Sequence, residues 1–343
     1  GIFRNVCSKC YNRYKEGWDK VSVSDQEVKK LVDIATRNMW FGYLTEALDE
    51  DLGWIDFEKE VAFVVNTLST VLKNCDHADF NGLISLKEKT IKYIVQAFDF
   101  FNRRYDSSVP VVGVTFRKIE DRYLLEYPKG SGVKHIDQGK VIGELFGALK
   151  ELAFLLKEYL RIFVEEPLDV LIQENLIQPD PKFVKDNYIV SFNYTKVYEK
   201  LYQKGPDAVM HIHGDLTGEI VLGINPDEND VLETVDTAFL QFKKYYQRVR
   251  YGTDVEYLHF IKKLKERKKT PDHLCLTVVG HSLDATDKDI LMELFDIPDI
   301  LTIMYHEESK ICDFMKNIIT MYGKVGLDRL RTQNRLNFCP LNP

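Results

Sequence analysis

The chain has 343 residues, of which 45% are hydrophobic and 29% are charged, and its formal net charge is −7. This length and composition supply enough apolar material for one large domain or two smaller ones. The acidic balance does not favour nucleic acid as the main partner, because phosphate binding generally needs a basic excess. No stretch approaches the roughly 18 apolar residues of a membrane-spanning helix.

The cysteines exclude two further classes of protein. Six cysteines are too few for a disulfide framework in a chain of this length. No secretory signal is visible, so we expect a cytoplasmic protein. Cys7 and Cys10 form the only Cys-x-x-Cys pair. A structural zinc site normally needs a second such pair or two histidines at comparable spacing, so no metal is expected.

Residues 1–185 have the pattern of a mainly helical region. Apolar residues recur every three or four positions over 28–48 and 139–165, which is the spacing of helices with one buried face. Ser85 and Glu88 have the spacing of a capping box ahead of a third apolar stripe. Alternating hydrophobicity over 111–127 predicts a small hairpin that turns near 120–121.

The pattern changes over residues 186–343, where short apolar runs of strand length are bounded by polar residues or glycine. These runs lie at 188–192, 208–212, 220–222, 274–279 and 300–305. Strands that are hydrophobic almost throughout are buried on both faces, which is typical of a parallel sheet covered by helices. We therefore predict an α/β, Rossmann-like part over 186–343, with ligands bound beyond the carboxyl ends of its strands.

Polar residues and glycines follow four of these runs directly. The first two runs lead into Ser-Phe-Asn-Tyr-Thr at 191–195 and His-Ile-His-Gly-Asp at 211–215. The next two lead into Gly223 and into Gly-His-Ser-Leu at 280–283, with Asp287 close behind. Each feature alone is also typical of a turn or a helix cap. Four of them in succession predict a ligand site along one edge of the sheet.

These motifs, in this order, resemble the AbiH family of bacteriophage abortive-infection proteins. The likeness extends to Val-Leu-Gly-Ile at 221–224, Asn-Met-Trp at 38–40 and Trp-Ile-Asp-Phe-Glu at 54–58. A strand-end asparagine, then His-Gly, then Gly-x-Ser-Leu is also similar to sirtuins. The resemblance implies a sirtuin-like nucleotide-binding fold, a role in anti-phage defence and NAD as substrate. For Asp56 and Glu58, pairing with basic residues is favoured over facing the pocket.

The resemblance and the chemistry together suggest hydrolysis of NAD to nicotinamide and ADP-ribose, through an oxocarbenium-like transition state. Asn193 would orient the ribose or a water molecule, because an amide donates and accepts hydrogen bonds without ionising. His213 would act as general base, with His211 as the alternative. The residues expected to bind the nucleotide are Ser191, Thr195, Gly214, Gly223, Gly280, His281, Ser282, Leu283 and Asp287.

Two other functions stay open. Protein deacylation or ADP-ribosylation is disfavoured, because sirtuin deacylases generally carry a four-cysteine zinc module. A non-catalytic sensor would bind a nucleotide or a phage-derived trigger and act through an oligomer or a partner from its defence operon. The glycine-rich loop of the AbiH family, Gly-Asn-Gly-Phe-Asp, does not occur from Gly1 onward. We expect it in a segment that precedes Gly1, and its true loss would favour the sensor.

Overall fold

The computed structural model describes residues 23–47, 57–74, 83–86, 98, 100, 115–126, 129–131, 134–183, 188–205, 208–225, 237–268, 273–333 and 335–341. They fall into two compact units. The first contains the described residues up to 189, together with 193–209 and 213–251. The second contains 190–192, 210–212 and the residues from 252 onward. Much of the sequence assigned to the α/β part, up to residue 251, therefore groups with the helices of the first unit.

In the described part of the first unit, the chain starts with the helices α2 (Asp25–Arg37), α3 (Met39–Ala47) and α4 (Phe57–Asn74). A capping box starts α2, since the Ser24 side chain accepts from the Glu27 amide and Glu27 accepts from the Ser24 amide. The helical pattern predicted over 28–48 is confirmed as two helices, interrupted at Asn38. The backbone of Asn38 is extended, and its side-chain amide donates to the carbonyl oxygen of Ala148 at 2.7 Å.

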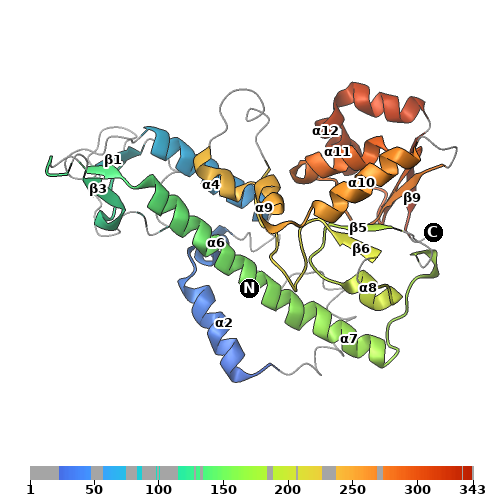
Figure 1. Ribbon diagram of the computed structural model, residues 1–343, viewed down its shortest axis with the longest axis horizontal. Helices are drawn as coiled ribbons and strands as arrows, with labels where there is room; N and C mark the ends of the chain where they lie inside the picture. Colours follow the sequence, from blue (N-terminus) through green and yellow to red (C-terminus); the bar gives the residue numbers. More distant parts are fainter. Residues whose placement is uncertain are drawn as a thin grey trace. The chain divides into compact units, whose positions relative to one another are not determined.

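A long helical rod forms the spine of this unit and confirms the helix predicted over 139–165. It consists of α6 (Gln138–Leu160), a π-helical turn called η2 (Arg161–Glu165) and α7 (Glu166–Gln173) (Figure 1). One face of α6 is buried, with Leu145 and Leu149 at its centre. The indole of Trp40, itself fully buried, donates to the carbonyl oxygen of Leu145 at 2.9 Å and joins α3 to this core.

Two small antiparallel pairs replace the hairpin expected over 111–127. Strand β1 (Leu83–Leu86) pairs with β2 (Thr115–Lys118), and β3 (Leu124–Glu126) pairs with β4 (Lys134–Ile136). The expected pairing of β2 with β3 is therefore wrong. The short helix η1 (Asp121–Tyr123) separates them, and it is anchored by the fully buried Tyr123, whose hydroxyl donates to Glu144 Oε2 at 2.5 Å. Because Ser85 lies in β1, its assignment to a capping box is also wrong.

The later part of the first unit contains η3 (Pro181–Phe183), α8 (Val197–Tyr202), η6 (Thr237–Phe242) and α9 (Lys244–Tyr251). Among the described residues, the run at 220–222 forms no strand, contrary to prediction. The side chain of Gln247 satisfies the backbone of Leu222 instead. Its Oε1 accepts from the Leu222 amide at 2.8 Å, and its Nε2 donates to the Leu222 carbonyl at 3.0 Å.

The second unit is built on a parallel three-stranded sheet of β7 (Cys275–Val278), β8 (Ile300–Tyr305) and β9 (Leu336–Pro340). The helices α10 (Val255–Arg267), α11 (Lys288–Asp296) and α12 (Lys310–Thr332) share one core with it (Figure 1). Strands β7 and β8 confirm the runs at 274–279 and 300–305. Strand β9 was not predicted, because its apolar residues are interrupted by Asn337 and Pro340.

Strands β5 (Ile189–Ser191) and β6 (Val209–His211) form a separate two-stranded sheet and confirm the runs at 188–192 and 208–212. The fold is thus α/β and mostly helical, with small sheets. Among the described residues the largest sheet has three strands, all parallel. No helix in the described ranges is both long enough and apolar enough to cross a lipid bilayer.

Candidate functional site

Hydrogen bonds in the first unit join two of the predicted strand-end segments to each other and to the run at 220–222. The Tyr194 hydroxyl donates to the carbonyl oxygen of Val221 at 2.9 Å, and the Val221 amide donates to the carbonyl oxygen of His213 at 2.8 Å. The Leu216 amide donates to the carbonyl oxygen of Tyr194 at 3.2 Å. The segments that follow β5 and β6 are therefore neighbours of each other and of the run at 220–222.

The two residues with predicted chemical roles differ in exposure. Asn193 is exposed to solvent. His213 is only 4% exposed, and its ring lies beside that of Tyr194 with the centroids 6.5 Å apart. Gly214 follows with a φ of +77°, a conformation that favours glycine. This turn carries the chain from buried His213 to the partly exposed Asp215.

Asp215 and Lys196 form an ion pair between the two strand-end segments. Lys196 Nζ lies 3.0 Å from Asp215 Oδ2, and both side chains are mostly shielded from solvent. Thr217 donates to Asp215 Oδ1 from its amide at 2.7 Å and from its hydroxyl at 2.5 Å. Burial alone would raise the pKa of Asp215, but the Thr217 hydrogen bonds and the Lys196 ammonium outweigh it and lower that pKa to about 2.

Gly223 is explained by packing. A Cβ atom at this position would lie 2.4 Å from the carbonyl oxygen of Phe242 and 3.1 Å from Gln247 Nε2. The close approach is needed because the Ile224 amide donates to that same carbonyl at 2.8 Å. A larger residue would break this contact, so the glycine has a structural reason to be present. Its predicted contact with a nucleotide stays a prediction.

The Gly280 turn of the second unit is organised around His281. The imidazole Nδ1 accepts from the Leu283 amide at 2.9 Å, and Nε2 lies 3.5 Å from Asp287 Oδ2. The ring also meets Phe192 edge to face, with the centroids 4.4 Å apart. Gly280 has a φ of +69°, and Leu283 holds a φ of +59° although it is not glycine and is fully buried. Both His281 nitrogens are thus engaged, which suits a holding role better than a base.

The remaining predicted residues of this unit serve local structure. Ser191 ends β5, and its carbonyl oxygen accepts from the Ile212 amide at 3.0 Å. Ser282 Oγ accepts from the Asp284 amide at 3.4 Å, and Asp284 caps η7 (Ala285–Asp287) by accepting from the Thr286 amide at 3.0 Å. Thr195, which belongs to the first unit, is partly buried.

Glu58 settles part of the interpretation of the Trp-Ile-Asp-Phe-Glu motif. Its carboxylate lies 2.6 Å from Lys244 Nζ, and the Lys244 side chain is 1% exposed. The expected pairing with a basic residue is therefore confirmed for Glu58, whereas Trp54 and Asp56 lie outside the described residues. A buried lysine needs such a partner, because an isolated ammonium is costly to remove from water.

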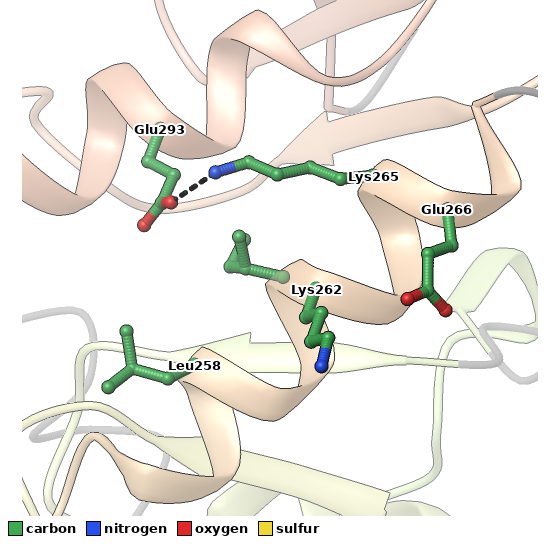
Figure 2. Close-up of a pocket in the computed structure, with 6 residues that line it drawn as sticks. Leu258, Lys262, Lys265, Glu266 and Glu293 are labelled. Atoms are coloured by element: carbon green, nitrogen blue, oxygen red, sulfur yellow. Dashed lines mark hydrogen bonds and ion pairs between the residues drawn. The ribbon is translucent and has the colours of Figure 1, made fainter.

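The second unit contains a pocket that is lined by none of the predicted site residues. Within the described parts of the chain, no three His, Cys, Asp or Glu side chains are grouped to hold a metal ion; Cys7 and Cys10 lie outside them. The pocket has a volume of about 330 Å³ between α10 and Glu293 of α11. Figure 2 shows the ion pair between Lys265 and Glu293, 2.6 Å apart, on its wall.

Sequence reasoning missed three residues whose contacts hold the strand-end segments together: Tyr194, Lys196 and Asp215. Tyr194 and Asp215 stand inside the motifs themselves, so a signal for them existed. Lys196 directly follows the first motif, but nothing in the sequence pairs it with Asp215, because that contact depends on how the two segments fold together.

Comparison with known proteins identifies the family. No curated protein and no solved structure matches the chain. The model of the family described as "Bacteriophage abortive infection AbiH" matches residues 10–304, which include all the strand-end motifs. The match covers well over half of the sequence, and the chain therefore belongs to the AbiH family of bacteriophage abortive-infection proteins.

Proposed function

We propose that this AbiH-family protein acts in anti-phage defence by hydrolysing NAD, with Asn193 and His213 in the reaction. The observation that carries the proposal is the set of hydrogen bonds among Tyr194, His213 and Val221, which holds the segment of Asn193 beside that of His213. Family membership supports the defence role. Depletion of NAD would stop metabolism in the infected cell.

In the proposed reaction, water attacks C1′ of the ribose that bears nicotinamide. The C–N bond breaks, nicotinamide leaves with the bonding electron pair, and a base accepts a proton from the water. Asn193 is exposed and suited to orient the ribose or the water. His213, the proposed base, is 4% exposed, so this role requires that the ligand uncovers its ring. The contacts predicted for Gly280, His281, Ser282, Leu283 and Asp287 stay proposals.

The burial of His213 also favours a second candidate function, a sensor that binds a nucleotide or a phage component without turning it over. A buried imidazole within a hydrogen-bonded turn stabilises a binding loop without meeting the substrate. Under this alternative, Asn193 contacts the ligand and His213 holds the loop in place.

The deciding experiment measures nicotinamide release from NAD by the full-length protein, alone and with lysate from phage-infected cells. We expect release that Asn193→Ala and His213→Ala each reduce by about 100-fold or more. His259→Ala, on the exposed face of α10, is the matched control and should retain activity. Absence of release under both conditions, with NAD still bound and the fold intact, would overturn hydrolysis in favour of the sensor. Loss in His211→Ala but not in His213→Ala would transfer the base role to His211.

A further inference from the structure

The π-helical turn η2 is an irregularity in the middle of the helical rod. The Glu166 amide donates to the carbonyl oxygen of Arg161, five residues earlier, instead of four. Each residue of an α-helix advances by about 100° around the axis, so this extra residue resets the direction of every side chain after it. Such bulges occur often at functional sites. The side chains whose direction η2 sets are therefore candidates for a functional role.

Glu165, the last residue of η2, faces α8 and the segment of Asn193. Its Oε1 accepts from the backbone amide of Lys196 at 2.7 Å, and its Oε2 lies 3.2 Å from Lys200 Nζ. Asp169, one helical turn later, lies 2.9 Å from the same ammonium. Only 14% of the Glu165 side chain is exposed, so these contacts form largely out of solvent, where charge-assisted hydrogen bonds are strong.

The contacts continue from Glu165 to the segment that follows His213. Lys196, whose amide Glu165 holds, extends its ammonium to Asp215, two residues beyond His213. Lys157 of α6 donates to the carbonyl oxygen of Gly218 in the same loop. The rod formed by α6, η2 and α7 thus supports both strand-end segments, the first through Glu165 and the second through Lys196 and Lys157.

We infer that Glu165 is a positioning residue of the strand-end site. The π-helical turn directs its carboxylate toward the backbone amide of Lys196, and the ammonium of Lys196 in turn holds the carboxylate of Asp215. The reaction that Glu165 would support rests on the proposed function. The contacts from Glu165 to Lys196 and Asp215 do not depend on it. Glu165 acts on the segments of Asn193 and His213 through the Lys196 backbone and through the Lys196 ammonium.

Hydrogen exchange measured by mass spectrometry on the full-length protein tests this without any ligand. The informative peptides cover 192–203 and 213–222, and a peptide from 141–152 in buried α6 serves as internal reference. Glu165→Ala should speed exchange in both informative peptides by about tenfold or more and leave the reference unchanged. Glu165→Gln should give a smaller effect, because its amide oxygen still accepts from the Lys196 backbone.

Two further variants separate positioning from general stability. Lys196→Met keeps the backbone amide that Glu165 holds but removes the ammonium, so only the 213–222 peptide should exchange faster. Glu166→Gln is the matched control: Glu166 pairs with Arg161 on the same rod, and its loss should leave both informative peptides unchanged. Faster exchange in all three peptides of Glu165→Ala, or in none, would overturn the inference.

The same variants distinguish failure of this inference from failure of the proposed function. If the wild-type protein releases nicotinamide, Glu165→Gln should lower kcat with little change in KM, because the groups that bind NAD remain. If the wild type releases none, the proposed function fails, while the exchange pattern still supports or overturns the role of Glu165.

Discussion

The hydroxyl group of Tyr194 donates to the carbonyl oxygen of Val221 at 2.9 Å, across 27 residues of sequence. Val221 in turn donates its amide to His213. One side chain and one backbone amide therefore join the segments that follow β5 and β6 to the run at 220–222. Motifs that follow one another along the chain are thus brought together in space by hydrogen bonds between residues of different motifs.

Removing the Tyr194 hydroxyl should weaken the link between these segments while the protein stays folded. Tyr194→Phe keeps the ring against His213 but leaves the Val221 carbonyl without this donor. We expect the free energy of unfolding to fall by about 1 kcal/mol, as measured by urea denaturation. A larger fall than that seen for His213→Ala would mean that the hydroxyl, and not the imidazole, dominates the stability of this loop.

Gly223 and Gly147 offer opposite responses to the same substitution. Gly223→Ala places Cβ 2.4 Å from the Phe242 carbonyl oxygen, a backbone atom that cannot turn away. We expect a loss of about 2 kcal/mol in the free energy of unfolding. Gly147→Ala, at an exposed position of α6 where Cβ meets nothing within 4 Å, should raise stability by about 0.5 kcal/mol or more. Equal effects in thermal denaturation would contradict the packing explanation for Gly223.

Asp215 predicts a specific dependence of stability on pH. Its pKa of about 2 in the folded protein lies below the ordinary value near 3.9. Its ionised form therefore contributes stability that is fully present above about pH 5 and is lost as the pH falls toward 2. We expect Asp215→Asn to cost about 1 kcal/mol at pH 7, since solvent screens part of the interaction. The cost should shrink at pH 3, and Thr217→Ala should reproduce part of it. A difference that is independent of pH would argue against the ion pair with Lys196.

The sequence predicts individual elements better than their connections. The helix predicted at 139–165 and the strands at β5, β6, β7 and β8 follow from local periodicity and form as expected. The pairing of β2 and β3 was wrong, because η1 and the buried Tyr123 separate two strands that alternate as a hairpin would. The run at 220–222 has the apolar character of a strand, yet it takes its hydrogen bonds from the distant Gln247 side chain.

The candidate site shows the same limit. The motif residues that end β5 and β6 are readable from the sequence because each follows an apolar run. Glu165 is not, since a π-helical turn leaves no periodic signature in an otherwise helical stretch. Lys196 and Asp215 are 19 positions apart, and only the folded backbone brings their charges within 3.0 Å.

The two ring nitrogens of His281 make contacts of different length, so they should contribute unequally to the stability of the Gly280 turn. Nδ1 accepts from the Leu283 amide at 2.9 Å, whereas Nε2 lies 3.5 Å from Asp287. A neutral imidazole that accepts at Nδ1 carries its proton on Nε2, which therefore faces the carboxylate. The shorter bond also holds Leu283 in a backbone conformation that non-glycine residues rarely adopt. We expect the Leu283 contact to contribute more to stability than the Asp287 contact.

Two substitutions separate these contacts. His281→Asn retains an acceptor near the position of Nδ1, and His281→Gln retains a donor near Nε2. If the Leu283 bond dominates, urea denaturation should show His281→Ala and His281→Gln destabilised by about 2 kcal/mol and His281→Asn by about half as much. Asp287→Asn should cost less than either. The reverse order, with His281→Gln the more stable variant, would make the Asp287 pair the main constraint on this turn.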